Sequence, residues 1–187
     1  MEHLNWDNLS LNTNDRVLDE LEKNKDKINW DNLSKNTSPR AITLLEQNQN
    51  KINWDNLSII LTMMSILHEP PEIINRILIL FQKNPDKFCW NQVAFERIMF
   101  LLGRDEFTKY QTQTEHYQTQ TEHLLFQLLN SNPDKLDWDY LSLSPQNVAM
   151  DLLENNIERI NWEKLSLNSC NRAVSLLLDF DKPVVLK

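Results

Sequence analysis

The residues best suited to chemistry lie in a tandem duplication near the middle of the chain. Residues 110–116 and 117–123 both read Tyr-Gln-Thr-Gln-Thr-Glu-His, so His116 and His123 each follow a glutamate. Imidazole and carboxylate groups are common metal ligands. Seven residues apart on one helix, however, the two histidines are about 10 Å apart. Sharing an ion would require His68 or a second chain, so the preferred interpretation is a solvated helix face, and no metal site is predicted.

The rest of the chain lacks the sequence patterns of known catalytic sites. It has no Gly-rich phosphate loop, no nucleophile elbow and no His-Glu-x-x-His motif, and Gly103 is its only glycine. We therefore predict no catalytic residue, no cofactor and no enzymatic activity.

The spacing of the tryptophans is the dominant pattern. The gaps between neighbouring tryptophans are 24, 24, 36, 48 and 24 residues, all multiples of twelve. Such a period indicates a repeat array in which each unit stacks on the next. The six residues are Trp6, Trp30, Trp54, Trp90, Trp138 and Trp162. We predict that they are structural and pack between adjacent units, since a buried indole contributes a large apolar area; a row that stacks on a ligand is the alternative.

Each unit is expected to contain two helices. In the second unit the first helix spans roughly 30–34, with Asn29 as its N-cap. The second helix runs from about Pro39 to Gln47, capped by Thr37 or Ser38, because proline is favoured at the first helical position. Ser144-Pro145 repeats this start signal in the fifth unit. No strand is expected, because alternation with period two is absent.

Asparagine takes the place of glycine at the predicted helix ends. Helices often end on a left-handed residue, and asparagine is the next best choice after glycine. Eighteen residues after each of five tryptophans, with the insertions discounted, stand Asn24, Asn48, Asn84, Asn132 and Asn156. We interpret these as C-caps; a recognition row for peptide or nucleotide edges is the alternative.

The fold class predicted is all-α, a single α-solenoid domain over residues 1–187. The units span about 5–28, 29–52, 53–88, 89–136, 137–160 and 161–187, with insertions at about 59–70 and 100–123. Both insertions extend apolar first helices, ending near Pro70-Pro71 and Gly103. They are too apolar to stand alone in water, so we expect them to pack together as a central hairpin lobe. The helix after Gly103 would run from Asp105 to about Asn130, roughly 38 Å.

Charge and cysteine content restrict the partners and the compartment. The net charge is −8, and nucleic-acid binding relies on Lys and Arg to neutralise phosphates, so nucleic acid is disfavoured as a partner. Cys89 and Cys170 stand at unmatched positions of different units, so no disulfide is expected and the chain is predicted to be intracellular. No signal peptide or membrane span is evident, the apolar run 57–67 being too short and too polar.

The repeat resembles a known group of proteins. Ile28-Asn-Trp-Asp-Asn-Leu-Ser-Lys-Asn36, Ala41-Ile-Thr-Leu-Leu-Glu-Gln-Asn48 and Asn84-Pro-Asp-Lys-Phe88 look like the short Trp/Leu/Asn helical repeats of giant DNA viruses, of the mimivirus type. The resemblance covers nearly the whole chain and carries no catalytic residue. It implies an α-solenoid interaction protein of the host cytoplasm or the virion. The fourth unit departs from the pattern, with Cys89, Asn91 and Ala94 in place of Asn, Asp and Ser.

These observations favour a non-enzymatic scaffold that binds protein. Variable positions of the second helices, and two tyrosines of the lobe, would contact the partner: Arg16, Asp19, Arg40, Thr43, Tyr110, Tyr117, Gln146, Asp151, Arg172 and Ser175. A structural or virion-assembly component is the alternative, self-associating through the lobe or the uncapped ends of the array. A nucleic-acid-binding repeat protein is the least favoured class.

Overall fold

The chain is helical throughout the part that is described. The structure, a computed structural model, describes residues 4–67, 71–90, 95–96, 98–99 and 115–180. Within these ranges there is no strand, which confirms the all-α prediction. The α-helices are α1 (Trp6–Leu11), α2 (Asp15–Lys23), α3 (Trp30–Leu33), α4 (Pro39–Gln47), α5 (Trp54–Leu67), α6 (Pro71–Lys83), α8 (Glu115–Asn130), α9 (Trp138–Leu143), α10 (Asn147–Glu154), α11 (Trp162–Leu165) and α12 (Asn171–Phe180).

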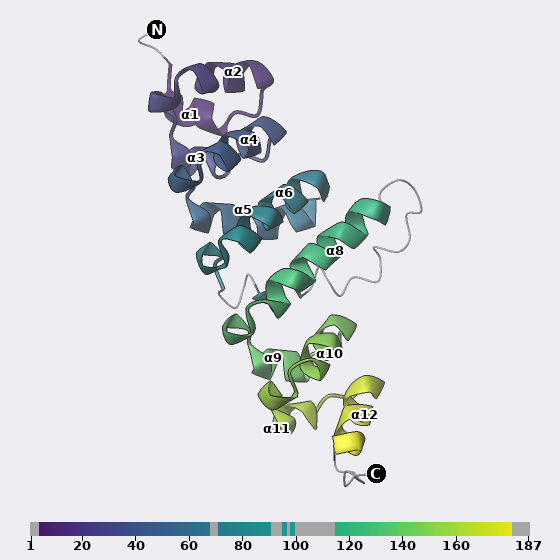
Figure 1. The fold of residues 1–187 in the computed structure, drawn as a ribbon. Helices are drawn as coiled ribbons and strands as arrows, with labels where there is room; N and C mark the ends of the chain where they lie inside the picture. Colours follow the sequence, from purple (N-terminus) through teal and green to yellow (C-terminus); the bar gives the residue numbers. More distant parts are fainter. Residues whose placement is uncertain (1–3, 68–70, 91–94, 97, 100–114, 181–187) are drawn as a thin grey trace.

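The helices follow one another in pairs from one terminus to the other (Figure 1). First helices contact first helices, as in α1 with α3 and α9 with α11, whereas α2, α4 and α6 contact one another in succession, as do α10 and α12. Sequence neighbours are therefore spatial neighbours, and the molecule is elongated along the direction of the chain.

Asparagine and serine begin the helices where the sequence predicted them. Asn29 Oδ1 accepts from the backbone N–H of Asn32 (3.0 Å), and Asn5, Asn53 and Asn161 do the same for their own helices. Ser38 caps α4, and Pro39 is its first residue. The Ser144-Pro145 prediction was wrong: α10 begins at Asn147, and Ser144 is the C-cap of α9, where its N–H bonds to the Leu141 and Tyr140 carbonyls.

Asn24 and Asn48 are C-caps as predicted, but their backbone is not left-handed. Their φ values are −125° at Asn24 and −131° at Asn48. The prediction was wrong at α10, whose C-cap is Asn155, whereas Asn156 begins the following 3-10 turn. Each side-chain amide donates to the carbonyl four residues back, as in Asn48 Nδ2 to Leu44 O (2.7 Å). The Asn48 carbonyl then accepts from the Lys51 N–H (2.9 Å), starting a short 3-10 turn. Asparagine is used here because its amide satisfies a free helix carbonyl, not because it tolerates a positive φ.

A 3-10 turn links each helix pair to the next, a feature that the sequence did not reveal. The turns are Lys25–Lys27, Gln49–Lys51, Pro85–Lys87, Pro133–Lys135 and Ile157–Arg159. The apolar residue that ends each linker is buried; for example, Ile28 and Ile52 are both inside the core.

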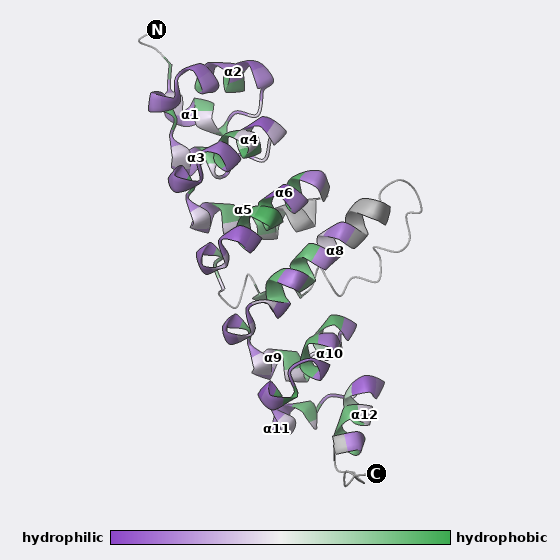
Figure 2. Ribbon diagram, in the orientation of Figure 1, coloured by the Kyte–Doolittle hydropathy of each residue, from purple (hydrophilic) through white to green (hydrophobic). Residues whose placement is uncertain are grey.

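One continuous apolar core runs between the layers of helices. Successive second helices contribute equivalent residues, such as Leu18, Ile42, Leu78 and Met150, all with no solvent exposure. Figure 2 shows hydrophobic and hydrophilic residues on different faces of these helices, which is the pattern of an amphipathic helix buried on one side. All six tryptophans are half-buried and pack against this core.

The longest helices are in the middle of the molecule. Helix α5 extends to Leu67, as the first insertion predicted, and α6 packs along α8. Buried Asn75 of α6 accepts from Thr121 Oγ1 of α8 (2.5 Å), and Gln82 Nε2 donates to the Leu124 carbonyl (3.2 Å). The predicted helix from Asp105 is described only over Glu115–Asn130, and most of the second extension, including Gly103, is outside the described residues.

Candidate functional site

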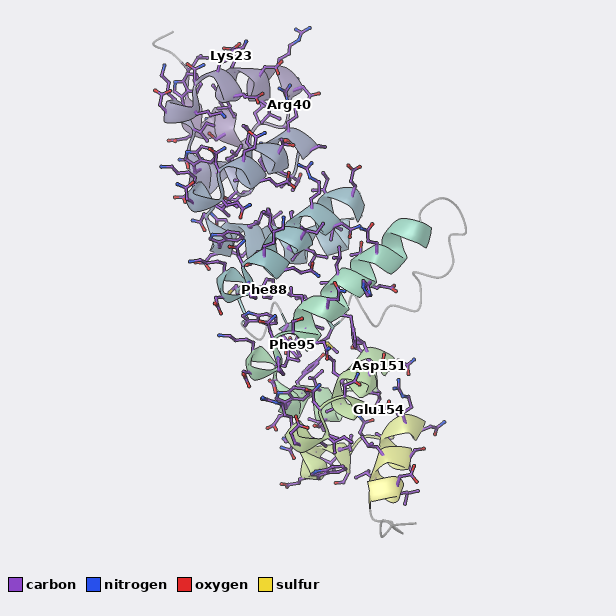
Figure 3. All side chains as sticks on the ribbon, viewed as in Figure 1. Lys23, Arg40, Phe88, Phe95, Asp151 and Glu154 are labelled. Carbon is purple, nitrogen blue, oxygen red and sulfur yellow. The ribbon has the colours of Figure 1, made fainter. Side chains whose placement is uncertain are left out.

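Arginines of the second helices bridge neighbouring helix pairs, and we name these contacts the arginine brace. Each arginine forms ion pairs with carboxylates of the preceding second helix. Figure 3 labels Arg40 on α4, and Asp151 and Glu154 on α10. The pairs are Arg40 with Asp19 and Glu22, Arg76 with Glu46, and Arg172 with Asp151 and Glu154. Each Nη1 also donates to the carbonyl of the first residue of that helix, at 3.0–3.4 Å.

Arg76 shows the geometry of the brace most fully. Its Nε and Nη2 donate to the two carboxylate oxygens of Glu46 at 2.9 and 2.6 Å, a forked arrangement that arginine makes and lysine cannot. The hydrogen bond to Glu46 raises the pKa of Arg76 above its ordinary value, so the guanidinium stays charged. A planar fork of this kind fixes the rotation of one helix relative to its neighbour.

Several of the predicted partner-binding residues belong to this brace. Asp19, Arg40, Asp151 and Arg172 are in its ion pairs, and Thr43 Oγ1 accepts from Arg76 Nη2 (2.8 Å). Their polar groups are therefore partly engaged between helix pairs. Their side chains remain partly exposed, for example 38% for Arg40.

The other predicted partner-binding residues are dispersed. Arg16 on α2 and Ser175 on α12 are both exposed. Gln146 precedes α10, and its buried Oε1 accepts no hydrogen bond from a described residue. Tyr117 belongs to α8, whereas Tyr110 is outside the described residues.

A second set of contacts between helix pairs, the asparagine ladder, was not recognised as such in the sequence. The residue before a tryptophan donates its N–H to a serine Oγ of the preceding unit: Asn29 to Ser10, Asn53 to Ser34, Cys89 to Ser58 and Asn161 to Ser142, at 2.9–3.1 Å. The asparagine side chains at that position donate to aspartates: Asn29 to Asp7, Asn53 to Asp31 and Asn161 to Asp139, at 2.6–2.8 Å.

Buried asparagines complete the ladder. Asn36 Nδ2 donates to the carbonyls of Ser10 (3.1 Å) and Asn12 (3.0 Å), and Asn168 Nδ2 makes the equivalent bonds to Ser142 and Ser144. The recurrence of Asn, Asp and Ser at fixed positions was the available signal, although a sequence does not reveal which donor faces which acceptor.

The fifth residue after the tryptophan forms an exposed apolar row. Leu11, Ile59, Leu143 and Leu167 occupy this position, with exposures of 45, 53, 43 and 73%. Leu11 and Leu143 end α1 and α9, whereas Ile59 lies within α5 and Leu167 follows α11. Of these helices, α9 and α11 contact each other directly. Lys35 has this position in the second unit, and Phe95, which has it in the fourth, is buried.

The tryptophans are held mainly by packing. The indole N–H groups of Trp90 and Trp138 donate to the carbonyls of Pro85 (3.1 Å) and Pro133 (2.9 Å). Trp54, Phe81, Phe88 and Trp90 form a chain of aromatic contacts with centroids 4.9–5.6 Å apart, which links the third and fourth units. These contacts fit the predicted structural role.

The described residues contain no group of three His, Cys, Asp or Glu side chains placed to hold a metal ion. His123 is exposed on α8, with Nε2 2.8 Å from Gln127 Nε2. In the same part of the chain, no helix combines the length and apolarity needed to cross a membrane.

Comparison with known proteins identified no relative. No protein-family model matches the chain, and no curated protein or solved structure matches it either. The functional argument therefore rests on the residues and their geometry.

Proposed function

We propose that the chain is an α-solenoid of six two-helix units with a central helical lobe. The support is the repetition of the same contacts at the same positions. The asparagine ladder joins the first unit to the second, the second to the third and the fifth to the sixth, and the arginine brace acts at the same three junctions. Stacking of this kind leaves a long surface instead of a single deep site.

On this architecture the protein acts as a non-enzymatic, intracellular scaffold that binds another protein. The observation that carries the proposal is the apolar row, in which Leu11, Ile59 and Leu143 are more than two-fifths exposed at equivalent positions. Exposed apolar residues that line up along one surface are typical of protein interaction sites. The arginines and carboxylates of the second helices would supply a second, polar contact surface. A viral origin, which the resemblance of the repeat suggests, is part of the same proposal.

The apolar row can be tested by selection of ligands for the immobilised chain from a random peptide display library. We expect peptides with spaced apolar residues to be enriched. Their binding should be lost in a Leu11→Ser/Ile59→Ser/Leu143→Ser variant and kept in an Ile157→Ser variant, since Ile157 is 41% exposed but lies on a 3-10 turn. Enrichment of no peptide, or equal binding by both variants, would overturn the proposal.

A further inference from the structure

The two ends of the described chain expose opposite halves of the same interface. Between units, the asparagines of one unit donate hydrogen bonds, and the aspartate, serine and backbone carbonyls of the preceding unit accept them. Each unit therefore has a donor face toward the N-terminus and an acceptor face toward the C-terminus. Among the described residues, no unit covers the donor face of the first unit or the acceptor face of the sixth.

The uncovered donor face consists of Asn5, Asn8, Asn12 and Arg16. Their equivalents Asn29, Asn32, Asn36 and Arg40 all donate to the preceding unit, whereas the side-chain N–H groups of these four donate to no described residue. Burial shows the same difference: Asn36 is 2% exposed and therefore buried, whereas Asn12 is exposed. Leu4 is 45% exposed, whereas its equivalents Ile28, Ile52, Phe88, Leu136 and Ile160 are 3–8% exposed.

The uncovered acceptor face consists of Glu163, Ser166 and the carbonyls of Ser166 and Asn168. The equivalent carbonyls in the fifth unit, those of Ser142 and Ser144, accept from Asn168 Nδ2. Ser166 is exposed, although Ser10, Ser34, Ser58 and Ser142 are at most 1% exposed. Val174 is 41% exposed, whereas Leu18, Ile42, Leu78 and Met150 at its position are fully buried.

We propose that the donor face of one copy stacks on the acceptor face of a second copy, head to tail. In the register of the internal junctions, Asn5 would donate to Ser166 Oγ and to the Glu163 carboxylate. Asn8 would donate to the second lone pair of the Glu163 carbonyl, which already accepts from Ser166 Oγ (2.7 Å), and Asn12 would donate to the Ser166 and Asn168 carbonyls. The contact would also cover the apolar side chains of Leu4 and Val174. An interface between two different faces is heterologous, so association can continue beyond the dimer.

The arginine brace is the one part of an internal junction that this contact lacks. Ser175 and Leu178 stand where the first unit has Asp19 and Glu22 and the fifth has Asp151 and Glu154. Arg16 of the second copy would therefore have no carboxylate to pair with. This makes the proposed association weaker than an internal junction, and it allows a test in which affinity increases.

Sedimentation velocity of the full chain over a range of concentrations tests the association itself. The average mass is expected to rise with concentration in the wild type. An Asn8→Asp/Asn12→Asp variant removes two donors yet keeps the Asn12 oxygen that accepts from the Asn14 N–H, and it is expected to stay monomeric. An Asn50→Asp/Asn130→Asp control makes the same charge change at exposed positions elsewhere and is expected to associate like the wild type.

Mixing variants tests the head-to-tail geometry. Val174→Glu places a charge on the acceptor face and is expected to be monomeric alone. Mixed with the Asn8→Asp/Asn12→Asp variant it should give a 1:1 dimer that grows no further, because each variant keeps one intact face. A symmetric contact would not be restored by mixing, and absence of the mixed dimer would overturn the proposal.

Restoring the missing acceptor gives the most specific test. Leu178→Glu places a carboxylate at the position of Glu22, Glu46 and Glu154, and it should tighten self-association about twofold to fivefold. Arg16→Ala should abolish that gain. Non-specific association of exposed leucines predicts the reverse, since Leu178 is 64% exposed and the change removes apolar surface.

This inference rests on the repeat architecture of the proposed function, and two further outcomes distinguish the failure of one from the failure of the other. Association by a chain ending at residue 180, but not by the full chain, would assign the acceptor face to residues 181–187 and overturn the proposal. A full chain that stays monomeric but selects peptides through the apolar row refutes only the head-to-tail contact.

Discussion

Single asparagines determine much of the local structure, and their position decides what each one does. Asn29 accepts through Oδ1 as a helix cap while its Nδ2 donates to the preceding unit. Asn48 ends α4 by donating its side-chain amide to the Leu44 carbonyl, and its own carbonyl accepts from the Lys51 N–H to start the following 3-10 turn. Because one amide offers a donor and an acceptor side by side, it can satisfy two backbone groups that a helix end leaves free.

The buried ladder asparagine can be tested against an exposed equivalent in the same molecule. We expect Asn36→Asp to lower the free energy of unfolding by about 3 kcal/mol, since it removes a donor to two carbonyls and places a charge in a buried site. Asn12→Asp, at the same position of the first unit, should change it by less than about 0.5 kcal/mol. Urea unfolding followed by circular dichroism measures both. Similar losses in the two variants would show that Asn36 does not act through the junction.

At the scale of elements, the packing of one helix pair on the next combines an apolar core with polar contacts of fixed geometry. The second helices bury one face, and the arginine brace joins their exposed edges. The apolar contacts supply most of the stability but are tolerant of rotation, whereas a forked ion pair holds one orientation.

A double-mutant cycle on the best-defined brace contact measures its contribution. We expect Arg76→Met and Glu46→Gln each to destabilise the chain, with a coupling energy of about 1 kcal/mol for this partly buried forked pair. Arg76→Lys should recover less than half of the coupling, because an ammonium group cannot make both bonds. Lys23→Met, which removes an exposed pair with Glu20 inside one helix, serves as the control and should have little effect. A coupling energy of zero would mean that the brace contributes to surface charge only.

At the scale of the whole molecule, contacts are local along the sequence. Helix pairs contact the pairs next to them, and the first and last pairs are at opposite ends of the molecule (Figure 1). The stability of such a chain is approximately a sum of unit and junction terms, so damage should stay close to where it is made.

Hydrogen exchange can show whether the damage is local. Leu45→Ala, a fully buried change in α4, should cost about 2–5 kcal/mol and speed exchange in α2, α4 and α6. Exchange in α10 and α12 should be nearly unchanged, and Leu153→Ala should give the converse pattern. Uniform loss of protection in all described helices would indicate one cooperative unit and contradict the proposed array.

The sequence by itself determined the helical class, the bounds of α4, the cap at Asn29 and the apolar faces, and it restricted the α4 cap to Thr37 or Ser38. Hydrophobic periodicity and capping are local properties, which is why these features could be predicted. It did not determine the backbone of the terminal asparagines, the 3-10 turns or the start of α10, where several local conformations are close in energy. The tertiary structure alone decided which donors meet which acceptors across a junction. It showed that Arg40 and Arg172 are braces, that the Asn12 amide donates to no described residue and that Ser166 is exposed. The sequence could not show this, because the junction contacts join residues at least 18 positions apart.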